Sequence, residues 1–296
     1  MTRSQALDKA FTLFRDSAPD PETATVSALR EADARLWASF PVGAADIVPV
    51  DAGGVPALRV TAPGAETGPV VVWFHGGGYQ LGAADGRRAF AADLSAASKA
   101  TVLVPDFRLA PEHPFPAAVE DAVAVYEWAL SRHDPASVSL GGESAGGGLA
   151  VVALLAARDR GLPQPAAAIP VSVWTDLALT GASYRGNAGH EPVATMTVYE
   201  QIRDAYLAGH DPRDPLASPL YADLTGLPPL LVMVGAVETL LDDSTALARR
   251  AEEAGVAVDL RVWPDMIHYW HLFGSFLPEG RRAVEAIAAF VRRHTA

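Results

Sequence analysis

The stretch "SVSLGGESAGGGLAVVALLAA" (residues 137–157) predicts a sharp turn that joins a buried strand to a buried helix. Gly142 and Gly146 stand two residues before and two residues after Ser144. A serine in such a turn needs glycine at both places, because a side chain there would strike the neighbouring strand and helix. The turn lifts the hydroxyl clear of the sheet and sets it beside the N-terminal amides of the helix. We therefore predict that Ser144 is a nucleophile.

A glycine-rich turn between a strand and a helix is also typical of nucleotide sites, and two features argue against that function here. No Lys-Ser or Lys-Thr pair follows the glycines, as it would in a P-loop. No acidic residue ends the next predicted strand, over residues 167–173, where a ribose partner would stand. The interpretation that remains is a serine nucleophile, which requires a base and an acid that orients the base.

Apolar strands and helices alternate along the chain on both sides of this turn. Strands are expected over residues 70–74, 101–105, 137–140, 167–173, 230–235 and 256–262, and helices over 87–98, 117–131, 145–158, 244–254 and 279–294. A hairpin is expected before them, over 47–50 and 57–61. Because strands that alternate with helices form mostly parallel sheets covered on both faces, the pattern predicts an α/β fold.

Two segments fall outside this alternation and are expected to form a helical cap. The first has two amphipathic stretches, the earlier with Leu7, Ala10 and Phe14 on one stripe. The second is the connection between residues 174 and 230, which is longer than usual and contains the helical pattern "MTVYEQIRDAYLAGH". The domains expected are cap helices over 1–45, a cap insertion over 175–215, and a catalytic domain over 46–174 and 216–296.

The composition narrows the class of protein. The chain has 296 residues, a formal net charge of −12 and no cysteine. The negative charge argues against nucleic acid or an anionic membrane as a partner, and the lack of cysteine excludes disulfides, thiolate metal sites and a cysteine nucleophile. The histidines lack ligand spacing with carboxylates, so no metal is expected. No apolar run has the length of a signal peptide or membrane span, and the cytoplasm is the expected location.

The base should follow the acid, and both should follow the serine, because folds with the nucleophile on such a turn keep that chain order. His268 lies in "VWPDMIHYW", a few residues past a late strand, where a loop can reach back over the sheet. It is the preferred base, and His271 is the alternative. His190 and His210 lie in the predicted cap insertion and are less suited to the role.

The acid is sought in "LLVMVGAVETLLDDS" (residues 230–244), where a strand is expected to end at Gly235. Glu238 lies in the turn just beyond that strand, level with the other predicted catalytic positions. Asp242 is the second choice. Since Asp242 and Asp243 stand where the next helix is expected to begin, their alternative role is to cap that helix.

A second glycine-rich loop, in "VVWFHGGGYQ" (residues 71–80), follows an early strand. A serine that attacks a carbonyl creates an oxyanion, which preorganised N–H donors must stabilise. Glycine lets the backbone approach that oxygen without a side chain between them. We predict an oxyanion hole formed by the amides of Gly76, Gly77 and Ala145. His75 is expected to order the loop without taking protons, and Tyr79 is a candidate substrate-binding residue.

Five motifs, in this order, resemble those of the hormone-sensitive-lipase-like esterases, the bacterial family IV branch of the α/β-hydrolases. They are "HGGGY", "FRLAPEHPFPAAVED", "GESAGG", "VGAVETLLDDS" and "DMIHYWHLF", and the resemblance spans roughly residues 45–290. The segment "VWTDLALTGASY" and the Glu-x-Leu-Leu-Asp-Asp form look most like members related to monoterpene ε-lactone hydrolase. Phe107 stands where tyrosine is usual, and Glu238-Thr239 stands where many members have Asp-Pro, which leaves Asp242 open as the acid.

The resemblance implies an α/β-hydrolase fold, with an eight-stranded, mostly parallel sheet and a helical cap, and no cofactor. It assigns the triad to Ser144, Glu238 and His268, and the oxyanion amides to Gly76, Gly77 and Ala145. Residues 108–112 would then support the oxyanion loop.

The predicted function is that of a serine carboxylesterase which hydrolyses short- to medium-chain esters through an acyl-enzyme. A lactone hydrolase or a deacetylase of small acetylated metabolites would use the same residues, and a ligand-binding pseudo-hydrolase is the alternative of another class. The partner expected is a small ester or lactone, and a homodimer is possible through the strand at 256–262 and the last helix. Cap residues that either line the substrate pocket or only pack the cap are Phe11, Phe14, Trp37 and Phe40.

Overall fold

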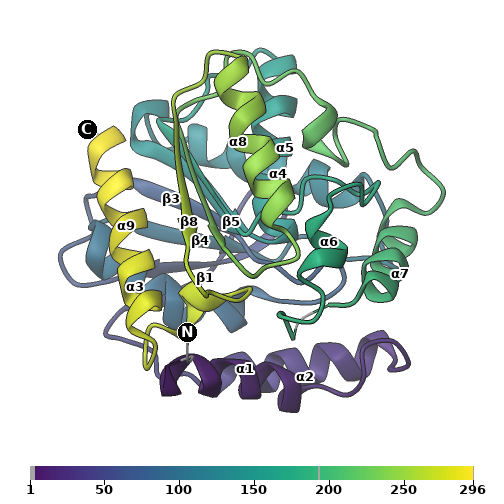
Figure 1. The fold of residues 1–296 in the computed structure, drawn as a ribbon. Helices are drawn as coiled ribbons and strands as arrows, with labels where there is room; N and C mark the ends of the chain where they lie inside the picture. Colours follow the sequence, from purple (N-terminus) through teal and green to yellow (C-terminus); the bar gives the residue numbers. More distant parts are fainter. Residues whose placement is uncertain (1–3, 193, 296) are drawn as a thin grey trace.

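The computed structural model describes residues 4–192 and 194–295, and an eight-stranded sheet forms the centre of this part of the chain (Figure 1). The strands are β1 (Asp46–Asp51), β2 (Pro56–Thr61), β3 (Val70–Phe74), β4 (Thr101–Pro105), β5 (Val138–Glu143), β6 (Ala167–Val171), β7 (Leu230–Gly235) and β8 (Val258–Trp263). Their order across the sheet is β1-β2-β4-β3-β5-β6-β7-β8. Strands β1, β2 and β4 are antiparallel neighbours, and all pairs from β4 to β8 are parallel. The predicted α/β fold with a mostly parallel sheet is confirmed.

Helices cover both faces of the sheet. They are α1 (Gln5–Ser17), α2 (Val26–Ala38), α3 (Arg88–Ser98), α4 (Ala117–Leu130), α5 (Ala145–Asp159), α6 (Ser183–Gly186), α7 (Met196–Leu207), α8 (Leu241–Glu253) and α9 (Pro278–His294), with 3-10 turns η1 (Ala84–Arg87), η2 (Pro135–Ser137), η3 (Pro219–Tyr221) and η4 (Trp270–Phe273). Figure 1 shows α4, α5 and α8 on one side of the sheet and α3 with α9 on the other. The sheet therefore has a separate apolar core on each face.

Strand β3 shows why the central strands are apolar throughout. Val72 and Phe74 belong to the core that also holds residues of α4 and α5, whereas Val71 and Trp73 belong to the core beneath α3 and α9. Alternate side chains of a strand point to opposite faces, and both faces are covered here. Each residue of β3 is therefore buried.

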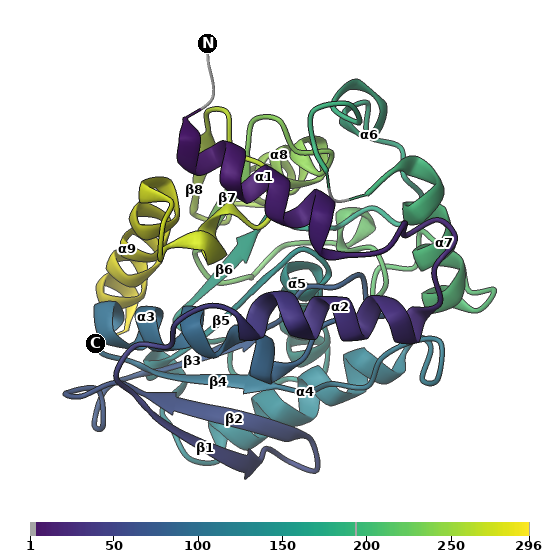
Figure 2. The ribbon, with the colours of Figure 1, turned by 90° about the horizontal axis from the view of Figure 1, so that it is seen from below.

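Helices α1 and α2 lie across one end of the sheet, close to α7 and the segment that precedes it (Figure 2). Each of the two helices begins at a side-chain cap: Ser4 Oγ accepts from the Leu7 amide, and Thr25 Oγ1 accepts from the Ala28 amide. This arrangement agrees with a cap made of an N-terminal part and an insertion. The proposed boundaries at residues 45, 175 and 215 remain predictions.

Several strand boundaries differ from those expected; the strand expected over 167–173, for example, ends at Val171, and two other differences have a visible cause or consequence. The strand expected at 256 begins at Val258, because the Val256 amide turns back and donates to the Ala251 carbonyl at the end of α8. The strand expected to end at Leu140 continues to Glu143, which pairs with Val171 of β6. The pairing brings the end of β5 up to the predicted nucleophile.

Helix α8 begins earlier than expected, and neither aspartate at its start caps it. Asp242 accepts a hydrogen bond from the Ser183 amide, and Asp243 accepts hydrogen bonds from the two amides of residues 175–176. Their predicted capping role is therefore wrong. These carboxylates instead hold the backbone of the segment that follows β6, because α8 packs beside it.

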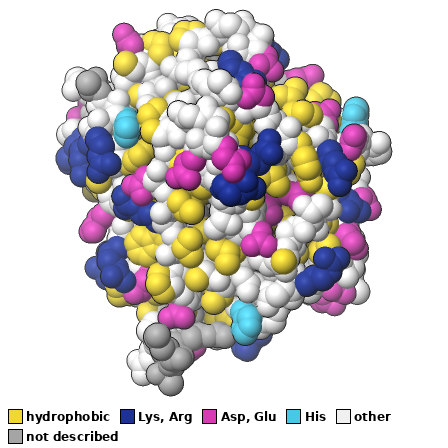
Figure 3. All heavy atoms as spheres, turned by 45° about the horizontal axis from the view of Figure 1, so that its top comes forward, with side chains coloured by type: hydrophobic (Ala, Val, Ile, Leu, Met, Phe, Trp, Pro, Cys, Tyr) yellow, Lys and Arg dark blue, Asp and Glu magenta, His cyan; other side chains and the backbone are white. Residues whose placement is uncertain are grey.

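The surface carries both signs of charge. On the face turned toward the viewer in Figure 3, acidic and basic side chains are interspersed among hydrophobic ones. The net charge of −12 is therefore not gathered into one acidic patch on this face. In the part of the chain that the structure describes, no helix has both the length and the apolar character needed to span a membrane.

Candidate active site

The turn between β5 and α5 has the conformation that the glycine spacing predicts. Ser144 has φ +57° and ψ −126°, a strained conformation for a residue with a side chain. A Cβ atom on Gly142 would lie 2.4 Å from the Gly146 carbonyl oxygen, and one on Gly146 would lie 2.1 Å from the Phe74 carbonyl oxygen. Only glycine fits at either position, so the close approach of β3, β5 and α5 forces the serine into the turn.

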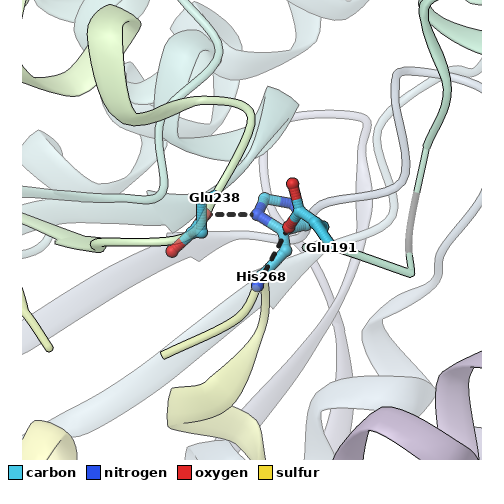
Figure 4. A group of neighbouring side chains, drawn as sticks. All are labelled: Glu191, Glu238 and His268. Atoms are coloured by element: carbon cyan, nitrogen blue, oxygen red, sulfur yellow. Dashed lines mark hydrogen bonds and ion pairs between the residues drawn. The ribbon is translucent and has the colours of Figure 1, made fainter. Parts of the chain in front are cut away.

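Glu238 and His268 form a buried hydrogen-bonded pair (Figure 4). His268 Nδ1 donates to Glu238 Oε2 at 2.8 Å. The other carboxylate oxygen of Glu238 accepts from the Ser172 hydroxyl at 2.8 Å and from the Gly235 amide at 2.6 Å. These contacts fix the carboxylate and leave Nε2 of the imidazole directed elsewhere. Asp242, the alternative acid, bonds to the cap insertion instead.

The charges around His268 favour its protonated form. Burial alone would lower its pKa, but the hydrogen bond and charge of Glu238 and the charges of Glu191 and Glu143 outweigh it. The pKa of His268 is therefore raised above its usual 6.5. A base of this kind accepts a proton readily, which suits it to activate a hydroxyl near neutral pH.

The other histidines have no such partner. His271 is buried against the rings of Trp73, Phe90 and Trp270, and neither of its ring nitrogens has a hydrogen-bond partner among the described residues. Burial, together with the nearby His268 and Arg87, lowers its pKa well below the usual value. His271 is therefore a neutral core residue. His190 and His210 are exposed, outside the triad.

The predicted role of Gly76 in the oxyanion hole is wrong. Its amide donates to Glu143 Oε1 at 2.7 Å and is therefore unavailable to a substrate. The next two glycines, Gly77 and Gly78, line the same cavity as Ser144. Within the described residues, no acceptor takes the amides of Gly77, Gly78 or Ala145. The candidate donors in this loop are therefore Gly77 and Gly78, in place of the predicted Gly76 and Gly77.

Gly77 adopts a conformation that other residues rarely reach. Its φ is +123°, and a Cβ atom there would lie 2.2 Å from the Leu81 carbonyl oxygen. The loop folds back on itself at this point, since the amides of Gln80 and Leu81 both donate to the Gly77 carbonyl. The glycine is required by this tight turn as well as by access to the cavity.

Glu143 holds the glycine-rich loop that follows β3 (residues 75–80), called here the oxyanion loop, through its bond to the Gly76 amide. It is completely buried and accepts hydrogen bonds from Trp73 Nε1 and from Arg87 Nε, the latter at 2.6 Å. Arg87 is itself buried, with its guanidinium 4.8 Å from the centre of the Trp37 ring. A buried carboxylate is tolerated only when its charge and lone pairs are satisfied, and here both are.

His75 and Phe107 shape the start of the same loop. Burial and the charge of Arg87 lower the pKa of His75 to about 3, so its ring is neutral. The ring stacks on Phe107 with centroids 4.4 Å apart, and Nδ1 contacts the Gly76 carbonyl at 2.9 Å. This agrees with the prediction that His75 orders the loop and takes no proton from a substrate.

Arg30 connects the cap to the oxyanion loop. Its guanidinium donates to the Gln80 carbonyl at 2.7 Å, to the Ala110 carbonyl at 2.9 Å, and to the Glu112 carboxylate. The Ala110 amide in turn donates to the Tyr79 carbonyl at 2.8 Å. Residues 108–112 therefore hold the loop in place, as the resemblance implies, and α2 helps to hold both.

A cavity of about 710 Å³ lies beneath the cap, and Ser144 and His268 both line it. Of the four aromatic cap residues predicted to line or pack near the pocket, one lines this cavity and three do not. Phe14 lines it, whereas Phe11, Trp37 and Phe40 are not among the described lining residues. Trp37 and Phe40 pack with Phe273, and Phe11 packs against the core beneath α3 and α9. For these three residues the packing interpretation is the correct one.

Tyr79 was predicted to bind substrate, and the structure contradicts this. Its side chain is buried and stacks on Tyr206 with ring centroids 3.8 Å apart. Tyr79 follows three glycines and has φ +60°; its ring packs on Tyr206 of α7, and it is not among the described residues that line the cavity. Its role is to attach the oxyanion loop to the cap insertion.

Glu191 was not predicted from the sequence, although it lies between α6 and α7 and lines the cavity. Its buried carboxylate accepts from the backbone amide of His268 (Figure 4). It also accepts from the backbone amide of Thr239. One glutamate in a long connection gives no sequence signal of its own. Only the docking of the insertion on the sheet reveals the contact.

Glu191, Glu238 and His268 together could be mistaken for a metal site. One ligand atom from each of Glu191, Glu238 and His268 lies within 4.8 Å of the others. All four carboxylate oxygens already accept hydrogen bonds from the protein, and His268 Nδ1 is bonded to Glu238. A cation would have to displace these donors, so the residues do not suit a metal ion.

Comparison with known proteins adds independent evidence. A family model described as "alpha/beta hydrolase fold" matches residues 71–272. The chain is 48% identical over 234 residues to an acetyl-hydrolase of Streptomyces hygroscopicus, covering 79% of this chain and 78% of that one. It is 33% identical over 267 residues to an esterase of Acinetobacter venetianus, covering 89% and 88%.

Solved structures agree with these relatives. An esterase from the bacterial hormone-sensitive lipase family superimposes with a TM-score of 0.97 at 44% identity, over 100% of both chains. The esterase EstE5, in crystals soaked with p-nitrophenyl butyrate, superimposes with a TM-score of 0.93 at 40% identity, over 99% of both chains. The match includes the cap, because it extends over nearly the whole of each chain.

Proposed function

We propose that this chain, which belongs to the α/β-hydrolase fold family and to its bacterial hormone-sensitive-lipase branch, is a serine carboxylesterase. Its proposed catalytic residues are Ser144, Glu238 and His268. The observation that carries this proposal is the buried Glu238–His268 pair, whose imidazole lines the same cavity as the strained serine. The relatives named as esterases and the full-length structural matches support the same function.

The chemistry follows from the contacts. His268 Nε2 takes the proton from Ser144 as the serine oxygen attacks the ester carbonyl carbon. Glu238 keeps Nδ1 protonated and stabilises the imidazolium. The negative oxygen of the tetrahedral intermediate is stabilised by the amides of Gly77, Gly78 and Ala145. His268 returns the proton to the leaving alcohol, and water then repeats the attack to release the acid and free the serine.

The cap shapes the substrate cavity. Phe14 and Leu29 line it from the N-terminal segment, and Val198 and Ile202 line it from α7. This supports a division into a cap over 1–45 and 175–215 and a catalytic domain over 46–174 and 216–296. The substrate is a small-molecule ester.

A series of p-nitrophenyl esters from acetate to palmitate tests this function. We expect turnover to be highest for short to medium acyl chains, because the cavity is enclosed by two cap segments and has the volume of a small-molecule site. Release of p-nitrophenol measures the rate. An optimum at palmitate would contradict the chain-length proposal, and a folded protein with no turnover on any ester would contradict the esterase.

Lactone hydrolysis and deacetylation would use the same residues and remain secondary. The name of the Streptomyces relative specifies acetyl groups, which favours acetyl esters as the first substrates to test. Neither the Streptomyces relative nor the Acinetobacter relative is named as a lactone hydrolase. A ligand-binding pseudo-hydrolase is not favoured, since the chain carries Ser144, Glu238 and His268, residues suited to act as nucleophile, acid and base.

We also propose that two copies of the chain pair along β8. This strand ends the sheet, bonded to β7 on one side, and it exposes 39% of Leu260 and 43% of Val262. Unpaired, partly apolar edges favour strand pairing between chains. Light scattering should give twice the mass of one chain for the wild type and the mass of one chain for Val262→Lys. A wild-type monomer at all concentrations would exclude the dimer.

A further inference from the structure

Glu191 occupies a position between the two loops that carry the proposed acid and base. Its Oε1 accepts from the His268 amide at 3.0 Å. Its Oε2 accepts from the Thr239 amide at 2.7 Å and from the Thr239 hydroxyl at 2.5 Å. The carboxylate is buried, and it comes from the cap insertion and not from the sheet. One cap side chain therefore binds both catalytic loops.

These loops determine the length of the hydrogen bond between the proposed base and the proposed acid. Thr239 directly follows Glu238, and the amide held by Glu191 is that of His268 itself. The Tyr199 hydroxyl of α7 also contacts Thr239 Oγ1, at 2.9 Å, so the cap holds the acid loop at two points. Movement of either loop would lengthen the 2.8 Å bond between His268 and Glu238.

Glu191 also adds charge beside the imidazole. The groups around His268 are the carboxylates Glu238, Glu191 and Glu143 and the neutral His271, together with the phenols of Tyr199 and Tyr269 and the buried Arg87. The pKa of Glu191 is raised above its usual value, because burial and the charge of Glu238 outweigh the charge of His268 and the hydrogen bonds from Thr239, which lower it. Three donors point at this carboxylate and favour its charged form against that rise.

We propose that Glu191 is a positioning residue, which holds the His268 and Glu238 loops in register and places a second negative charge beside the imidazole. The inference rests on the proposed esterase function. If Glu191 has this role, the cap insertion positions the proposed base and acid and also forms a wall of the cavity. A cap that undocks would therefore weaken the base as well as open the site.

The test compares Glu191→Gln with wild type and with a matched control. Glutamine keeps the size but loses the charge and one acceptor. We expect kcat for p-nitrophenyl acetate to fall about 10- to 100-fold at a nearly unchanged KM. The matched control, Glu200→Gln, changes an exposed carboxylate of α7, which belongs to the same insertion but is not among the described residues that line the cavity. It should keep the wild-type kcat.

The pH profile separates positioning from a purely structural role. Neutral His268 is the active form, so wild-type kcat/KM should fall as the pH drops through a value above 6.5. Removing the charge of Glu191 lowers the pKa of His268, and the acid limb should move down by about one pH unit. Glu191→Asp keeps the charge but does not span both loops, so it should lower kcat and leave the acid limb in place.

Three outcomes decide the question. If Glu191→Gln lowers the melting temperature but keeps the wild-type kcat and acid limb, Glu191 is only structural and the proposal is wrong. If Glu191→Gln does not fold, Glu191→Asp decides it, and an unchanged kcat in that variant overturns the register role. If wild type itself hydrolyses no ester, the proposed function fails, and this failure is distinct from that of Glu191.

Discussion

Replacing Ser144 with alanine is expected to lower kcat for p-nitrophenyl acetate by about 10⁴- to 10⁶-fold. The variant removes the nucleophilic oxygen and leaves the Cβ atom, so the strained turn with φ +57° has the same shape and the protein should fold as before. The oxyanion amides and the cavity remain, and they account for the small rate that should persist. Initial rates measured beside wild type at equal folded concentration give the ratio.

Labelling by a fluorophosphonate supplies the control for this experiment. Wild type should take up one label per chain, and Ser144→Ala should take up none, with matching circular dichroism spectra and melting temperatures. A variant that keeps a tenth or more of the wild-type rate would place the nucleophile elsewhere. A wild type that takes up no label and hydrolyses no ester would instead support a ligand-binding pseudo-hydrolase.

Glu238→Gln is expected to lower kcat by about 10⁴-fold. Glutamine can keep Oε1 as the acceptor for the Ser172 hydroxyl and the Gly235 amide, which leaves its NH₂ group facing His268 Nδ1. The imidazole must then carry its proton on Nε2, and this tautomer cannot take the proton from Ser144. The same ester assay measures the loss.

Asp242→Asn is the matched control for the choice of acid. Asp242 is the second residue of α8 and accepts from the Ser183 amide, and asparagine can still accept that bond. It should keep most of the wild-type kcat. Near-normal activity in Glu238→Gln, together with an inactive Asp242→Asn, would reverse the assignment that the structure supports.

The fold was predictable because its signals are local. Buried strands such as β3 and β7 read as short apolar runs, and both have the expected bounds. The turn at Ser144 was predictable for the same reason, since glycines at fixed spacing report a close approach of backbones. The start of β8 shifted because a local turn intervenes: the Val256 amide bonds back to the Ala251 carbonyl at the end of α8, so the strand begins later.

The site was less predictable because its errors come from contacts between distant parts of the chain. Three consecutive glycines look alike in the sequence, and only the Glu143 carboxylate beneath them distinguishes Gly76 from Gly77 and Gly78. Tyr79 looked like a binding residue until Tyr206 was seen stacked on it. Glu191 had no local signal, although it lines the cavity and contacts the loop of the proposed base.

The docking of α1 has a consequence for the order in which the protein matures. Phe14 packs on Tyr269 and Phe273, with ring centroids 5.7 and 5.3 Å apart, so α1 waits for partners that are synthesised much later in the chain. At ribosomal rates this interval is on the order of 10–50 s. A helix of 13 residues is marginal alone in water. Helix α1 therefore folds late although it leaves the ribosome long before its partners, and its apolar stripe stays open to chaperones or misassociation until residues 269–273 have been synthesised.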